Sequence, residues 1–70
     1  MRADLVEQAA KVIPDAPVLV NLVSKRVRQL QSGRKSLVDA RPGTGHADLA
    51  LLEVIEGKIT AELAEEEDDA

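Results

Sequence analysis

The chain contains no cysteine, phenylalanine, tyrosine or tryptophan, and it has one methionine and one histidine among its 70 residues. The lack of cysteine excludes disulfides and thiolate zinc sites, which are the common supports of a domain this short. The lack of aromatic rings leaves leucine, valine, isoleucine and alanine to supply all of the apolar burial. Because a core below about 70–80 residues rarely contributes more than ~3–5 kcal/mol, the composition predicts one small domain that gains stability from a partner.

Long apolar runs are also missing. The longest ones, Val18–Val20 and Leu49–Leu52, are far shorter than the ~20 residues that cross a bilayer. Met1–Asp4 lead into an amphipathic stretch rather than into the apolar segment of a signal peptide. Together with the lack of cysteine, which suits a reducing compartment, these features predict a cytoplasmic protein without membrane contact.

Charge is distributed unevenly behind a net charge of −4. Residues 25–41 carry six basic side chains and one acidic one, whereas residues 62–70 carry six acidic side chains and no basic one. Like-charge repulsion predicts a disordered acidic tail over residues 62–70, following a helical domain over residues 1–61. Three roles are open to this tail: it could keep the chain soluble, mimic nucleic acid, or bind a basic surface.

Apolar residues at helical spacing predict an all-α fold. The expected helices span Asp4–Val12, Ala16–Gln31 and Ala47–Ala61. Asp4 and Asp15 are the expected N-caps of the first two helices. Pro14 should end the first helix, and Gly33 should end the second. The apolar stripe of the second helix consists of Leu19, Leu22, Val23, Val27 and Leu30.

The third expected helix has apolar residues on more than one face, so it should be held on two sides. Gly57 lies within it, where glycine costs about 1 kcal/mol relative to alanine. This glycine either marks a break before a fourth short helix from Lys58 or permits a close backbone approach. Residues 33–46 are rich in loop formers and predict a connecting loop, with Leu37 and Val38 as its hydrophobic anchor.

No residue pattern indicates catalysis. His46 has no companions at a metal-binding spacing, so it is expected in a loop or at a helix start. Gly43–Gly45 lacks the lysine and the preceding strand of a phosphate-binding loop. Glu53 and Glu56 are expected on a solvated helix face, with an ion pair to a partner as the alternative for Glu53. We therefore expect no catalytic residue, no cofactor and no metal.

Lys25, Arg26 and Arg28 are crowded together on the second helix. This cluster could be a solvated face, a nucleic-acid contact or a protein contact. The acidic net charge and the lack of stacking aromatics argue against a nucleic-acid contact. A protein contact fits better, because arginine makes bidentate pairs with carboxylates. Arg26 borders the apolar stripe and Arg28 projects about 200° away from it. We therefore expect one of the two arginines to pair with a carboxylate of a partner protein.

Two segments, VNLVSKRVRQLQ at residues 20–31 and ALLEVIEGKI at residues 50–59, carry a family resemblance. They resemble the omega subunit of bacterial RNA polymerase, whose signature is an RxRQL/M segment followed by an AL-EI-EGKI segment. The resemblance implies a domain of three to four short helices, without catalysis of its own, in a DNA-directed RNA polymerase. It also implies binding to beta prime, the largest catalytic subunit, and help with its folding and its assembly with alpha and beta.

The resemblance further implies a set of partner-binding residues. They are Arg26, Arg28, Gln29, Leu30, Leu51, Glu53, Val54, Gly57 and Ile59. Val27 departs from the alanine of many members. Met1–Leu5 does not match the MARVT-like segment that contributes to a guanosine tetraphosphate site in some members, so the resemblance does not extend to this ligand. The alternative function is a small helical DNA-binding regulator that uses Lys25–Arg41 on phosphate groups.

Overall fold

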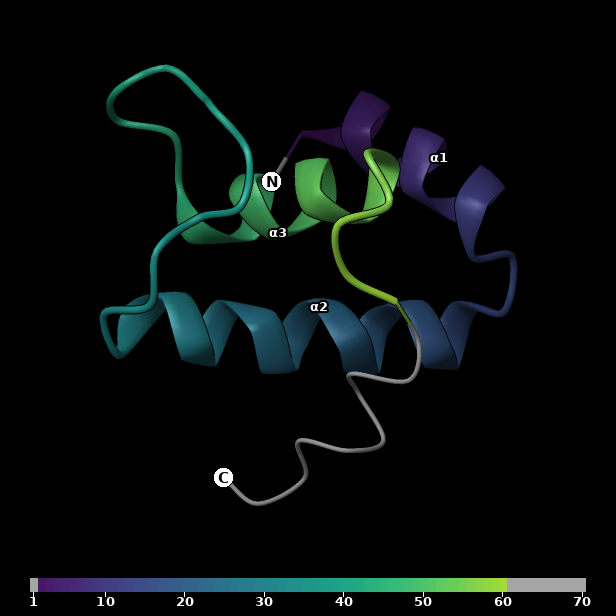
Figure 1. Cartoon of the computed structure of the whole chain (residues 1–70). Helices are drawn as coiled ribbons and strands as arrows, with labels where there is room; N and C mark the ends of the chain where they lie inside the picture. Colours follow the sequence, from purple (N-terminus) through teal and green to yellow (C-terminus); the bar gives the residue numbers. More distant parts are fainter. Residues whose placement is uncertain (1, 61–70) are drawn as a thin grey trace.

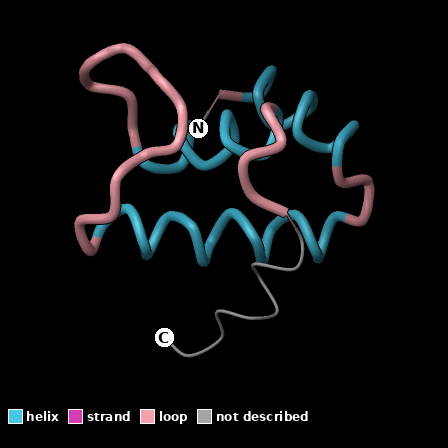
Figure 2. Tube along the Cα trace, viewed as in Figure 1, coloured by secondary structure: helices cyan, strands magenta, loops and turns pink. Residues whose placement is uncertain are grey.

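The computed structural model describes residues 2–60; Met1 and residues 61–70, and with them the predicted acidic tail, lie outside the described residues. The described chain forms helices α1 (Ala3–Val12), α2 (Ala16–Gln31) and α3 (His46–Ile55). Figure 1 shows α1 and α3 on one side of the longer α2, and Figure 2 shows the loops that join them. Residues 2–60 contain no strand, so the all-α prediction is confirmed. None of the helices in this part of the chain is long and apolar enough to cross a membrane.

The long helix α2 begins and ends as predicted. The Asp15 side chain accepts a hydrogen bond from the backbone N–H of Val18 at 3.3 Å and so caps the N-terminus. Pro17 lies in the first turn, where a missing N–H costs nothing. After the helix ends at Gln31, Gly33 adopts a φ of 107°, a conformation that favours glycine.

Helix α1 begins one residue earlier than predicted. Arg2 occupies the N-cap position, and Asp4 lies within the first turn. The Arg2 guanidinium donates a hydrogen bond to the Asp4 carboxylate at 2.8 Å, and this bond lowers the pKa of Asp4. The prediction of Asp4 as the N-cap is wrong, because Ala3 is already helical and Arg2 holds the Asp4 carboxylate. Pro14 ends the helix as predicted, since α1 stops at Val12.

Helix α3 is shorter than predicted, because it ends at Ile55. Gly57 then adopts a φ of 74°, and the backbone N–H of Lys58 donates to the Glu53 carbonyl at 2.8 Å. A Cβ at Gly57 would meet no atom within 4 Å, so this glycine serves the backbone turn and not a close approach. The helix therefore breaks before Gly57, as one of the two interpretations of this glycine predicted. Residues 58–60 form no fourth helix.

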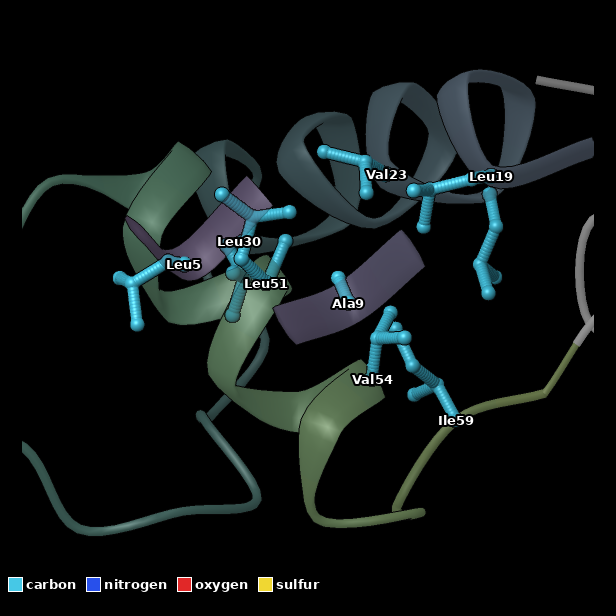
Figure 3. Close-up of a cluster of buried hydrophobic side chains, with 10 residues drawn as sticks. Leu5, Ala9, Leu19, Val23, Leu30, Leu51, Val54 and Ile59 are labelled. Atoms are coloured by element: carbon cyan, nitrogen blue, oxygen red, sulfur yellow. The ribbon is translucent and has the colours of Figure 1, made fainter. Parts of the chain in front are cut away.

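The core lies among the three helices, and α3 packs against both α1 and α2. The expectation that this helix is held on two sides is therefore confirmed. Figure 3 shows the buried side chains converging from all three helices and from the segment after α3. They are Leu5, Ala9, Leu19, Leu22, Val23, Leu30, Ala50, Leu51, Val54 and Ile59. Of the stripe predicted for α2, four residues are buried, and Val27 is half-buried and packs against the core.

Leu22 gives a direct test of this core, because it is completely buried while Val20, two residues away, is 63% exposed. We expect Leu22→Ala to destabilise the fold by ~2–5 kcal/mol, since it removes buried methyl groups and leaves a cavity. Against a core contribution of ~3–5 kcal/mol, that loss should leave much of the chain unfolded at room temperature. Thermal melting followed by circular dichroism measures the loss. Val20→Ala is the matched control, and equal melting of the two variants would contradict the prediction.

Candidate functional site

A buried ion pair joins α2 to α3. Arg26 on α2 is 4% exposed, and Glu53 on α3 is completely buried. Nε of Arg26 donates to Oε1 of Glu53 at 2.5 Å, and Nη2 donates to Oε2 at 3.1 Å. Nη1 donates to Oε1 of Gln29 at 2.9 Å. Nε and Nη2 of Arg26 therefore bind the Glu53 carboxylate in a bidentate manner, which is the strongest geometry for an arginine–carboxylate pair.

The same ion pair holds the start of the loop between α2 and α3. Nη2 of Arg26 also donates to the carbonyl oxygen of Lys35 at 3.0 Å. Oε2 of Glu53 accepts from the backbone N–H of Leu37 at 2.9 Å and from the Ser36 hydroxyl at 3.3 Å. Among the described residues, no buried side-chain nitrogen or oxygen lacks a hydrogen-bond partner. Two helices and a loop are therefore fixed to one another at a single point.

The position of Glu53 corrects the sequence prediction. Glu56 is exposed as expected, but Glu53 is completely buried and binds Arg26 of its own chain, instead of facing solvent or a partner. The pairing was missed because the two residues are 27 positions apart, whereas helical periodicity compares residues along one helix only. The available signal was a carboxylate within the apolar run of α3, opposite an arginine that borders an apolar stripe.

The nine residues assigned to partner binding by resemblance occupy different environments. Six of them are buried: Arg26, Leu30, Leu51, Glu53, Val54 and Ile59. Gln29 is half-buried, and Arg28 and Gly57 are exposed. The assignment of all nine to a partner surface stays a prediction, and direct contact with a partner is open to the three that reach the surface.

Polar groups, and not apolar ones, anchor the loop after α2. The sequence predicted Leu37 and Val38 as a hydrophobic anchor, yet the Leu37 side chain is 51% exposed and Val38 is half-buried. The prediction is wrong for Leu37, because the buried Glu53 carboxylate binds its backbone N–H and leaves its side chain in solvent. An exposed leucine next to the basic residues Arg34 and Lys35 is a surface feature that the sequence analysis did not identify.

Among the hollows on the surface of residues 2–60, two do not involve the ion pair. A shallow groove of about 120 Å³ is lined by Val6, Leu19, Val20, Val23, Ser24 and Leu51. A wider hollow of about 470 Å³, where the loop before α3 approaches the start of α1, includes Arg2, Arg41 and Asp48. The Thr44 hydroxyl in this hollow donates to the backbone carbonyl of Arg41 at 2.7 Å, so its hydrogen bond serves the loop turn. His46 is exposed, and no three acidic or histidine side chains within residues 2–60 could hold a metal.

Removal of Arg26 should be far more damaging than removal of its neighbour Arg28. Arg26→Ala leaves the Glu53 charge buried without its partner, which costs ~3–5 kcal/mol. Arg28→Ala changes an exposed side chain, so its effect should stay within about 0.5 kcal/mol. The free energy of unfolding from urea titrations measures both. If Arg26→Ala unfolds at the same urea concentration as Arg28→Ala, the ion pair does not hold the helices.

Comparison with known proteins gives the chain a family. No family model matches it, and neither does any solved structure. The chain is 37% identical to the DNA-directed RNA polymerase subunit omega of Trichlorobacter lovleyi over 59 residues. The aligned residues cover 84% of this chain and 85% of that relative. It is 44% identical over 64 residues to the proteins of the same name from Helicobacter pylori and Helicobacter acinonychis, with 89% of this chain and 86% of each relative covered. The chain therefore belongs to the omega-subunit family of DNA-directed RNA polymerase.

Proposed function

We propose that the chain binds the beta prime subunit of RNA polymerase and helps it to fold and to assemble with alpha and beta into the core enzyme. The family makes the chain an accessory subunit of DNA-directed RNA polymerase, without catalytic activity of its own. The choice of beta prime as the partner is our inference from the two signature segments. This role places the chain in the cytoplasm.

The observation that carries the proposal is the bond between the two signature segments. Arg26 belongs to the RxRQL segment, Glu53 belongs to the segment that ends in EGKI, and the two side chains bind each other inside the protein. The residues that define the family therefore hold α2, α3 and their loop in one geometry. A surface ordered in advance loses less conformational entropy on association, so such a framework suits a protein whose task is binding.

The size of the core also favours a partner. The described chain buries ten apolar residues, none of them aromatic. A partner that binds only the folded state stabilises it by about 2.7 kcal/mol at a concentration 100 times Kd. Against the ~3–5 kcal/mol of a core this small, that gain is large. Assembly into the polymerase would thus stabilise the small subunit as well as the large one.

Within this proposal the nine signature residues have two roles. The six buried ones keep the shape of the domain, and Arg28, Gln29 and Gly57 contact beta prime directly. An exposed arginine is well suited to this task, because its planar group binds a partner carboxylate with two hydrogen bonds.

Charge removal at Arg28 tests this contact. We expect Arg28→Ala to weaken binding to purified beta prime about tenfold, or ~1.4 kcal/mol, because one charge-assisted contact at the edge of the interface is lost. Lys11→Ala, at an exposed position on α1, removes the same charge and is the matched control. Co-purification with the tagged native chain identifies the partner, and titration of each variant gives the affinity. If the polymerase subunits co-purify with the tagged chain but Arg28→Ala binds beta prime as tightly as the native chain, the subunit role stands and the Arg28 contact is rejected.

The alternative of a DNA-binding regulator makes the opposite prediction. A regulator that contacts several phosphates loses affinity with a log–log salt slope near −0.9 per phosphate. For an acidic chain without stacking aromatics, we expect no measurable binding to a short duplex at physiological salt. Fluorescence anisotropy of a labelled duplex checks this. Sequence-selective binding at micromolar concentration would favour the regulator.

A further inference from the structure

The second half of α2 and the loop after it form a surface with charge of one sign. We call Arg28, Arg34 and Lys35 the basic surface; residues 25–35 contain no acidic residue. All three residues of the basic surface are exposed. Arg26 also lies in this stretch, but its charge is balanced inside the protein by Glu53. The basic surface therefore presents three exposed positive charges.

Hydrogen bonds at the end of α2 keep these charges together. The backbone N–H of Arg34 donates to the Gln29 carbonyl at 3.1 Å, so the chain turns back against the last turn of the helix. The Arg26 side chain then binds the Lys35 carbonyl at 3.0 Å. Both loop cations are thus held close to α2 by bonds that do not involve their own charged groups.

The described chain ends close to the same helix. Ile59 is 5% exposed and belongs to the same buried cluster as Leu19 and Val23 of α2. Figure 1 shows the last described residues running from the end of α3 towards α2. Ten residues follow Thr60, and an extended chain of that length spans up to ~33–36 Å. Since the 16 residues of α2 measure about 24 Å, the segment is long enough to reach every cation of the basic surface.

We propose that the acidic segment Glu62–Asp69 docks on the basic surface of its own chain. The segment carries six acidic side chains and no basic one, against the three cations of the surface. Exposed ion pairs contribute only ~0–1 kcal/mol each, so the docked state is a set of exchanging contacts. Its strength comes from attachment to the same chain, because short flexible linkers give effective concentrations near millimolar. In the chain free of beta prime, the docked segment shields the surface from other polyanions, and added salt weakens the docking. Binding of beta prime at Arg28 would displace the segment from that residue.

A nitroxide label tests the docking, because the chain has no cysteine and Ala70→Cys creates a single attachment point. At low salt we expect the label to broaden the amide signals of Arg28, Arg34 and Lys35, and we expect the broadening to fade in 0.5 M sodium chloride. The matched control carries the same label on a tail with Glu62→Gln, Glu65→Gln, Glu66→Gln, Glu67→Gln, Asp68→Asn and Asp69→Asn. It keeps the length of the tether and should show weak broadening that salt does not change. The substitutions lie outside the described fold, so unchanged amide positions of the core residues Leu5, Ala9 and Val54 confirm that folding is intact.

Other occupants of the basic surface give different results. Equal broadening in the native and neutralised tails would overturn the proposal, since it would reflect the tether alone. Broadening of an unlabelled chain by a separate labelled chain would point to a second copy and would also overturn it. We further expect the neutralised variant to bind a short duplex about tenfold more tightly than the native chain at low salt. Equal binding would mean that the surface is open to nucleic acid in the intact protein, and the docking would be rejected.

Discussion

The bond between Arg26 and Glu53 determines how α2, α3 and the loop between them are arranged. Taking two charges out of water costs several kcal/mol for each ion, and this cost is met only when the remaining donors and acceptors are also bonded. Here the Glu53 carboxylate accepts from Arg26, Ser36 and Leu37. An apolar pair of similar volume could join the two helices, but it would leave the Leu37 N–H and the Lys35 carbonyl without these partners. The specific contribution of the ion pair is therefore the placement of the loop.

This polar linkage is informative because the apolar core around it is small. With no aromatic side chain, the buried cluster consists of aliphatic residues. Aliphatic cores of the right size tolerate many alternative packings, and the details of packing decide whether one arrangement is preferred. A fully bonded ion pair has few alternative geometries, since arginine and carboxylate must meet in a fixed relative orientation. In this domain the apolar residues favour collapse, and the buried charges select which collapsed arrangement forms.

The sequence predicts the parts of this fold that depend on neighbouring residues. The limits of α2 follow from Asp15, Pro17 and Gly33, whose effects act within a few residues, and the apolar stripe of α2 follows from helical periodicity. The burial of Glu53 could not be predicted in this way, because its partner lies on another helix. The exposed side chain of Leu37 has the same origin, since Glu53 determines where its backbone lies. The resemblance assigned Arg26 and Glu53 to partner binding, which stays a prediction, whereas their bond to each other could be found only from the three-dimensional arrangement.

The turn at Gly57 has a consequence for the chirality of this position. The turn directs the chain back so that Ile59 enters the core, and no atom lies within 4 Å of where a Cβ would stand. Space is therefore available for a side chain, and the obstacle to an L-residue is the φ of 74° alone. A D-alanine adopts this backbone conformation without strain and would fit the same space. At residue 57 the fold restricts the chirality of the residue and not its size, and glycine meets this restriction because it is the one achiral residue that is genetically encoded.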